Sequence, residues 1–143
     1  MKKILLIDDD EFFHHIFNVI FRKKYLIDSA TSSDKVYEYI FNVRYDLIMV
    51  DISLDNRDVG KILISEIRKL QTFEKIPIIC CTAHSSHIKK REVEEAGADY
   101  FLTKPVDSAK LREVVDFFLF YGRNKDALRK FEISFDVREM IIG

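Results

Sequence analysis

The run DLIMVD at residues 46–51 constrains the fold of this chain more than any other stretch. Its four central residues are all apolar, and an aspartate stands at each end. The run is too short for a free-standing helix and too apolar for a surface loop. Continuous apolar runs of this length are typical of strands buried on both faces, as in parallel sheets. We therefore predict a buried strand that leaves the core at Asp51.

Strand and helix patterns alternate along the rest of the sequence. Besides 46–51, apolar runs predict strands at residues 2–7, 25–30, 77–82 and 100–102. After each strand the apolar residues take helical spacing, which predicts helices from residue 11 and near 34–43, 59–70, 85–96 and 107–121. Five strand–helix units with apolar strands predict an α/β domain, a parallel sheet with helices on both faces.

Composition excludes several function classes. The net charge of −1 gives no reason to expect direct binding of nucleic acid or of a membrane surface. No apolar run reaches 18 residues, and the N-terminus enters a strand pattern without a signal peptide. Cys80 and Cys81 are neighbours on a predicted strand, so they point to opposite faces and are core thiols. We expect a cytoplasmic protein.

Functional side chains stand where the predicted strands end. Asp8 and Asp9 follow the first strand, Asp51 the third, Thr82 the fourth and Lys104 the fifth. Taken singly, each has an ordinary explanation as a helix cap, a turn residue or a solvated lysine. The carboxyl ends of parallel strands, however, meet at one edge of a sheet, where ligands bind in such folds. Their joint placement predicts a shared site.

The chemistry of this set points to phosphate. Three carboxylates that lie close together repel each other, and a divalent cation relieves the repulsion. Oxygen ligands without histidine or cysteine suit Mg²⁺, which keeps phosphate oxygens as further ligands. Lys104 and the Thr82 hydroxyl would bind the remaining phosphoryl oxygens. Asp51 is then placed as a nucleophile that could carry the phosphoryl group.

Four motifs of this sequence resemble the receiver domains of two-component response regulators. They are IDD at 7–9, DLIMVD at 46–51, IPIICCTA at 76–83 and GADYFLTKP at 97–105, and the resemblance covers residues 1 to about 120. It implies a flavodoxin-like (βα)₅ fold, a doubly wound parallel sheet of order 2-1-3-4-5. It also implies a phosphorylation-activated signalling switch, and not an enzyme in the turnover sense.

The resemblance assigns the phosphate and metal roles residue by residue. Asp51 would accept a phosphoryl group from a histidine kinase, a phosphotransfer protein or a small phosphodonor. Mg²⁺ would be held by Asp8, Asp9, Asp51 and the backbone carbonyl of Ser53. These assignments carry the family's pattern over to matching positions of this chain.

The resemblance also implies how the switch is transmitted. Thr82 and Phe101 would form the switch pair, and Lys104 would join Pro105, usually through a cis peptide bond. The face made by the fourth helix, fifth strand and fifth helix would bind a downstream protein. His84 lies near the mouth of the predicted site, where it either controls water access or has no role.

The loop after the third strand departs from the family pattern. Receiver domains usually carry a proline four residues after the phospho-acceptor and a glycine eight residues after it. Asp55 and Val59 occupy those positions here, and the glycine comes one residue later, at Gly60. We expect a loop that is one residue longer, with the chemistry of the site unchanged.

Two other function classes were weighed against the switch. Phosphatases and phosphotransferases of the haloacid dehalogenase type also use a strand-end aspartate and Mg²⁺, but they place a second acid two residues later, where this chain has Ser53. A pseudo-receiver would bind partners without phosphorylation. It is disfavoured because all five expected side chains are present, namely Asp8, Asp9, Asp51, Thr82 and Lys104.

The sequence divides into a receiver domain over 1–121 and a C-terminal extension over 122–143. Residues 131–138 alternate apolar and polar side chains, which predicts a strand. A lone strand needs a partner, so it would pair with its own sheet edge, with a second copy in a homodimer, or with an output domain outside this sequence. The alternative is a linker, or a short helix packed on the receiver domain.

Overall fold

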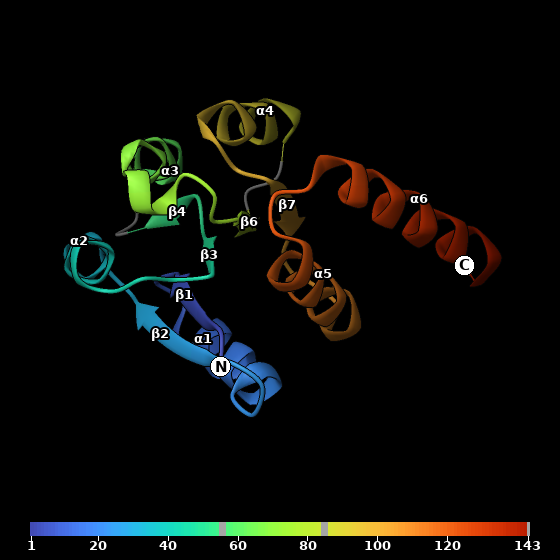
Figure 1. Cartoon of the computed structure of the whole chain (residues 1–143), viewed down its shortest axis with the longest axis horizontal. Helices are drawn as coiled ribbons and strands as arrows, with labels where there is room; N and C mark the ends of the chain where they lie inside the picture. The colour runs from blue at the N-terminus through green and yellow to red at the C-terminus, as the bar shows by residue number, and fades with distance from the viewer. Residues whose placement is uncertain (55–56, 84–85, 143) are drawn as a thin grey trace.

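Five parallel strands form the central sheet of this protein (Figure 1). The computed structural model describes residues 1–54, 57–83 and 86–142. The order across the sheet is β2-β1-β3-β6-β7, which confirms the predicted order of the five main strands. Their bounds are Lys3–Ile7 for β1, Leu26–Ala30 for β2, Leu47–Val50 for β3, Ile78–Thr82 for β6 and Tyr100–Thr103 for β7.

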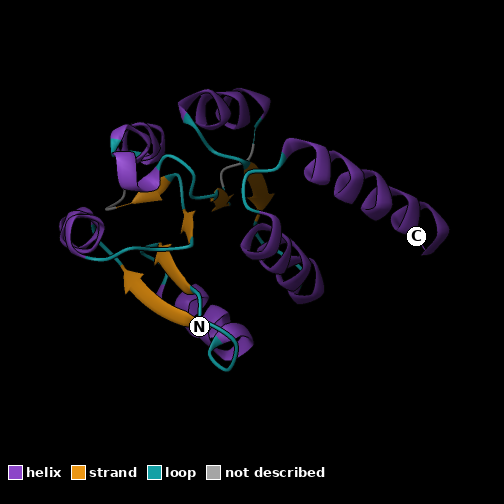
Figure 2. Cartoon of the chain, in the orientation of Figure 1, coloured by secondary structure: helices purple, strands orange, loops and turns teal. Residues whose placement is uncertain are grey.

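Helices cover both faces of the sheet (Figure 2). One face packs against α1 and α5, and the other against α2, α3 and α4. None of the described helices is long and apolar enough to cross a membrane. The helices run from Glu11–Phe21 (α1), Ser33–Asn42 (α2), Gly60–Lys69 (α3), His87–Ala96 (α4) and Ser108–Tyr121 (α5), and a 3₁₀ turn spans Gln71–Phe73.

The core explains why β3 is a continuous apolar run. All four residues of β3 are completely buried, with Leu47 and Met49 on the α1/α5 side and Ile48 and Val50 on the other. In α3 the buried side is centred on Leu63, Ile64 and Ile67, and Ile62 is exposed.

A short hairpin follows β3 and leads into α3. It consists of β4 (Ser53–Leu54) and β5 (Arg57–Asp58), and Asp55 between them lies outside the described residues. Gly60 begins α3 at a close approach of two backbone segments, since a Cβ at this position would lie 2.6 Å from the Cα of Ile52. The glycine therefore holds the start of α3 against the residue that follows Asp51.

The strand predicted over residues 131–138 is wrong. These residues belong to helix α6, which spans Lys125–Ile142 and runs along the outer side of α5 (Figures 1 and 2). Phe131 and Phe135, four residues apart, fall on the side of α6 that faces α5, where the Phe131 ring stacks on Phe117 with centroids 4.6 Å apart. The extension thus packs as a helix on the receiver domain, but as a long one.

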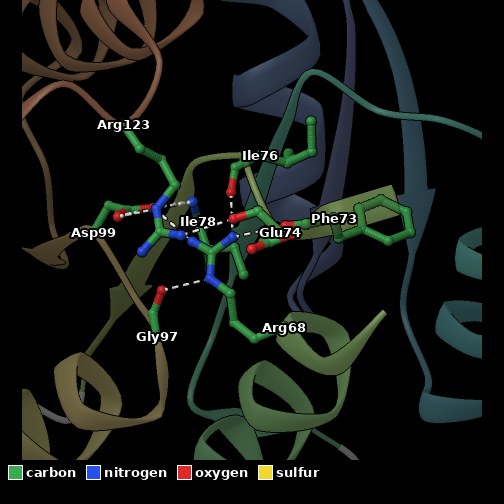
Figure 3. A network of polar contacts seen from close by, with 8 residues as sticks. All are labelled: Arg68, Phe73, Glu74, Ile76, Ile78, Gly97, Asp99 and Arg123. Atoms are coloured by element: carbon green, nitrogen blue, oxygen red, sulfur yellow. Dashed lines mark hydrogen bonds and ion pairs between the residues drawn. The ribbon is translucent and has the colours of Figure 1, made fainter. Parts of the chain in front are cut away.

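A partly buried ion-pair network lies where β6 and β7 begin (Figure 3). The guanidinium of Arg68 donates to Oδ2 of Asp99 at 2.7 Å and to three backbone carbonyls, those of Phe73, Ile76 and Gly97. Asp99 also accepts the backbone N–H of Ile78 and the Nε of Arg123, at 2.9 and 2.7 Å. The network ties the end of α3 to the starts of β6 and β7 and to the turn before α6.

Candidate phosphorylation site

Sheet register brings two of the predicted aspartates together. Strands β1 and β3 are parallel neighbours in which Ile7 pairs with Val50, so Asp8 and Asp51 leave the same sheet edge side by side. The backbone N–H of Asp51 donates to the Ile7 carbonyl at 2.9 Å and fixes this alignment. With Asp9, each residue can offer a carboxylate oxygen such that all three oxygens lie within 4.8 Å of one another.

Lys104 reaches the same site from β7. Its backbone N–H donates to the Thr82 carbonyl at 2.8 Å, which continues the pairing of β6 with β7. Its Nζ lies 2.6 Å from Oδ2 of Asp8 and 3.3 Å from Oδ2 of Asp51. Its link to Pro105 is a cis peptide bond, as the resemblance implied.

Burial and charge oppose each other at this cluster. Burial raises the pKa of the Asp8 carboxyl, and hydrogen bonds from Lys104 and the Asp10 N–H only partly offset it. Burial acts to lower the pKa of Lys104, but the hydrogen bond that its ammonium group donates to Asp8 and the charges of Asp8 and Asp51 outweigh it and raise that pKa. Lys104 is therefore charged at neutral pH and bridges the two buried carboxyl groups.

The donor set fits Mg²⁺. Asp8 and Asp51 are buried, at 1% and 8% exposure, whereas Asp9 is exposed, so the cluster opens to solvent on one side. Carboxylate oxygens with room for water and phosphate oxygens are what Mg²⁺ prefers. Oδ1 of Asp51 accepts the Ser53 N–H at 3.1 Å, which brings the Ser53 backbone to the site. The metal role of the Ser53 carbonyl stays a prediction.

A sequence model of the response regulator receiver domain matches residues 4–116. The chain belongs to this family. Phosphorylation-activated switching is the general function of receiver domains, which act as signalling switches. The expected fold and function are thus confirmed at the level of the family.

Individual relatives agree with this assignment. The chain is 30% identical over 115 residues to the chemotaxis protein CheY of Halobacterium salinarum, and the match covers 80% of this chain and 93% of the relative. The receiver domain also matches transcriptional regulatory proteins, of which it spans about half the length or less.

Solved structures show the same fold. The CheY-like receiver domain protein of Methanospirillum hungatei JF-1 superposes with a TM-score of 0.76 at 27% identity, covering 83% of this chain and 94% of that one. The receiver domain of the sensor histidine kinase PA1611 of Pseudomonas aeruginosa PAO1 gives 0.73 at 24% identity, with 82% and 97% covered. In that structure a magnesium ion is coordinated in the active site cleft.

The predicted switch pair lies on one face of the receiver sheet. Thr82 is completely buried at the end of β6, and it pairs with Thr103 of β7. Phe101 stands two residues before Thr103, so its side chain and that of Thr82 point to the same side, towards α3 and α4. Phe101 is half-buried. His84 lies outside the described residues.

Two site residues were missed by the sequence analysis. The Nε2 of the buried His14 lies 2.6 Å from the carbonyl of Asp8 and therefore donates to it, while Nδ1 is buried and has no hydrogen-bond partner among the described residues. The Phe13 ring lies 4.3 Å from the Nζ of Lys104, within reach of a cation–π contact. Phe13 is buried on α1, and the folded chain brings Lys104 to it.

Proposed function

We propose that Asp51 accepts a phosphoryl group from a histidine kinase or a phosphotransfer protein. The observation that carries this proposal is the combination of a nearly buried carboxylate with two further carboxylates and an ammonium group. One carboxylate oxygen from each of Asp8, Asp9 and Asp51 lies within 4.8 Å of the other two, and the Nζ of Lys104 is 3.3 Å from Oδ2 of Asp51. Receiver domains use phosphorylation as their general switch, which supports the same assignment.

The transfer needs little from the protein beyond placement and charge. An oxygen of Asp51 attacks the phosphorus of a phosphohistidine, the O–P bond forms as the N–P bond breaks, and the departing imidazole takes up a proton. The Lys104 ammonium, already held between Asp8 and Asp51, is placed to bind the oxygens of the new phosphoryl group. The Thr82 hydroxyl at the end of β6 is the second candidate for that task.

Asp8, Asp9, Asp51 and the Ser53 carbonyl would hold Mg²⁺. When bound, the ion neutralises the carboxylates and offsets the charge of the phosphoryl oxygens. The magnesium-bound receiver domain of PA1611 supports this proposal, because its ion lies in the active site cleft. The charge imbalance here supports it too, since one ammonium group faces three carboxylates.

A small phosphodonor tests the proposal directly. The protein is incubated with acetyl phosphate and Mg²⁺, and its intact mass is measured with time. We expect one added phosphoryl group that needs Mg²⁺ and is lost in the Asp51→Asn variant, whose amide is a poor nucleophile. Phosphate release with turnover and no adduct would instead indicate a phosphatase, and no reaction would indicate a pseudo-receiver. Labelling of Asp51→Asn at the wild-type level would refute the role of Asp51.

We further propose that the output is carried by protein contacts. On phosphorylation the Thr82 hydroxyl moves towards the site and Phe101 fills the vacated space, which changes the face formed by α4, β7 and α5. The placement of both side chains on one sheet face supports this coupling. A downstream protein is the expected partner, a second copy of the chain is a further candidate, and neither nucleic acid nor a membrane is expected.

We assign the receiver unit to residues 1–121 and the extension to 122–143. The family match at 4–116 and the turn at Gly122, where φ is +63°, support this division.

Two unpaired cysteine thiols in β6 suit the reducing cytoplasm as the place of action.

A further inference from the structure

Helix α6 carries two apolar stripes on different sides. The inner stripe comprises Leu128, Phe131 and Phe135, which are partly buried. The outer stripe comprises Ile133, Val137, Met140 and Ile141, at spacing i, i+4, i+7 and i+8. At 100° per residue the two stripes lie on nearly opposite sides of the helix.

The inner side of α6 packs against α5, and this packing fixes the rotation of α6 about its own axis. Phe131 stacks on Phe117, and the Arg138 guanidinium makes a bidentate ion pair with Glu113, with N–O distances of 2.7 and 3.1 Å. The Nζ of Lys110 lies 5.2 Å from the Phe135 ring centroid. These contacts all lie on the inner side of α6, so the outer stripe must face away from the receiver domain.

The outer stripe is large for an exposed apolar surface. Ile133, Val137, Met140 and Ile141 are 59%, 47%, 83% and 79% exposed. Single exposed apolar residues are ordinary, but four in helical register form one continuous patch. Together they expose on the order of 400–500 Å², as much as the largest patch on an ordinary monomer, and patches of that size often mark interaction sites.

We propose that the outer stripe of α6 packs against the outer stripe of a second copy of this chain, with the two helices antiparallel. At 100° per residue the charged residues between Ile133 and Ile141, which are Asp136, Arg138 and Glu139, lie to either side of the stripe, so two copies can meet there without a charge between them. A two-fold axis then passes near Val137, with Ile133 of each copy opposite Ile141 of the other.

Charge favours the antiparallel over the parallel arrangement. Lys130 lies one turn before Ile133 on the same side of α6. In a parallel pair the two Lys130 ammonium groups would meet at the end of the stripe. In an antiparallel pair the two Lys130 ammonium groups lie at opposite ends of the interface, so they do not repel each other.

The size of the patch predicts a weak dimer. A standard stable interface buries about 800 Å² on each partner, and the stripe supplies roughly half of that. We therefore expect a dimer whose dissociation constant is micromolar or weaker and whose population rises with protein concentration. The stripe makes no contact with Asp51, so the same behaviour is expected of the Asp51→Asn variant.

Sedimentation equilibrium tests whether the outer stripe forms a dimer interface. The wild-type protein is expected to shift from monomer to dimer between about 10 µM and 1 mM, and Val137→Glu should raise the dissociation constant at least tenfold by placing an unpaired charge in the interface. Phe41→Glu is the control, because Phe41 is an exposed apolar residue on α2, at 67% exposure, and lies outside the stripe. Circular dichroism checks that all variants are folded.

Two results would overturn the proposal. One is a wild-type protein that stays monomeric throughout, which would leave a different protein as the partner of the stripe. The other is a dimer that Val137→Glu does not weaken, or that Phe41→Glu weakens equally.

Disulfide trapping tests the arrangement. Cys80 and Cys81 are buried, so added thiols react without competition from them. Under mild oxidation Val137→Cys should form a covalent dimer, and an equimolar mixture of Ile133→Cys and Ile141→Cys should do the same. Ile133→Cys alone should stay monomeric, because the two positions lie far apart in an antiparallel pair. Efficient cross-linking of Ile133→Cys alone would refute the antiparallel packing.

Discussion

Replacing Arg68 by methionine should destabilise the receiver domain far more than an ordinary ion-pair deletion. Methionine keeps the apolar stem that packs against Gly97, where an added Cβ would lie 2.5 Å from the Arg68 Cγ. It removes the guanidinium that binds Asp99 and three backbone carbonyls (Figure 3). The substitution therefore isolates the polar network from the packing around it.

The burial of the ion pair determines how much free energy of unfolding the substitution removes. The side chains of Arg68 and Asp99 are only 12% and 13% exposed. Removing one partner of a buried pair typically costs about 3–5 kcal/mol, because the other charge stays buried. Asp99 keeps the Ile78 N–H and the Arg123 Nε, which reduces this penalty, while three carbonyls lose their donor. We expect a loss of about 3 kcal/mol, or a melting temperature lowered by roughly 10 °C.

Urea denaturation of wild type and Arg68→Met measures the loss. Lys24→Met is the control. The Lys24–Asp116 ion pair has a similar N–O distance, 2.8 Å, but its side chains are 61% and 37% exposed. Exposed pairs are worth about 0–1 kcal/mol. A loss below about 1 kcal/mol for Arg68→Met, or equal losses for both variants, would refute the view that burial makes this network stabilising.

Three further predictions concern the site and the residues around it. Asp9→Ala should weaken Mg²⁺ binding in calorimetry while leaving the metal-free protein at least as stable in thermal melts, because it relieves carboxylate repulsion. Phe101→Ala should reduce the change in hydrogen exchange of α4 and β7 on phosphorylation; an unchanged response would mean that Phe101 is only a core residue. Gly60→Ala should cost about 1–3 kcal/mol in urea denaturation and slow phosphorylation of Asp51, since its Cβ would press on the Ile52 backbone.

The fold and most of the site could be predicted because their determinants are local. The strands β1, β3 and β6 are largely continuous apolar runs, and each of Asp8, Asp51 and Thr82 stands at the end of one. Parallel pairing then brings these residues to one edge, whatever the details of packing. The acidic cluster and its contact with Lys104 therefore followed from the order of the elements alone.

The residues that contact and position the site residues could not be predicted in the same way. His14 donates to the Asp8 carbonyl, and Phe13 lies under Lys104, but both contacts depend on how α1 is turned against the sheet. Apolar spacing gives the buried side of a helix and not the partner of each side chain. Arg68 is a similar case, since its four acceptors come from segments of the chain that only tertiary structure brings together.

The C-terminal segment shows how one pattern can fit two structures with different partners. Apolar residues at 131, 133, 135 and 137 lie on one face of a strand, and a strand paired with a sheet edge would turn all four towards the same side of the sheet. On a helix the same residues divide into two stripes, and α5 covers only the stripe with Phe131 and Phe135. The helix prevails because Ala127 and Leu128 extend the inner stripe by a further turn onto the receiver domain. The outer stripe then remains exposed as a consequence of the helix, and antiparallel pairing with a second copy buries it without a charge.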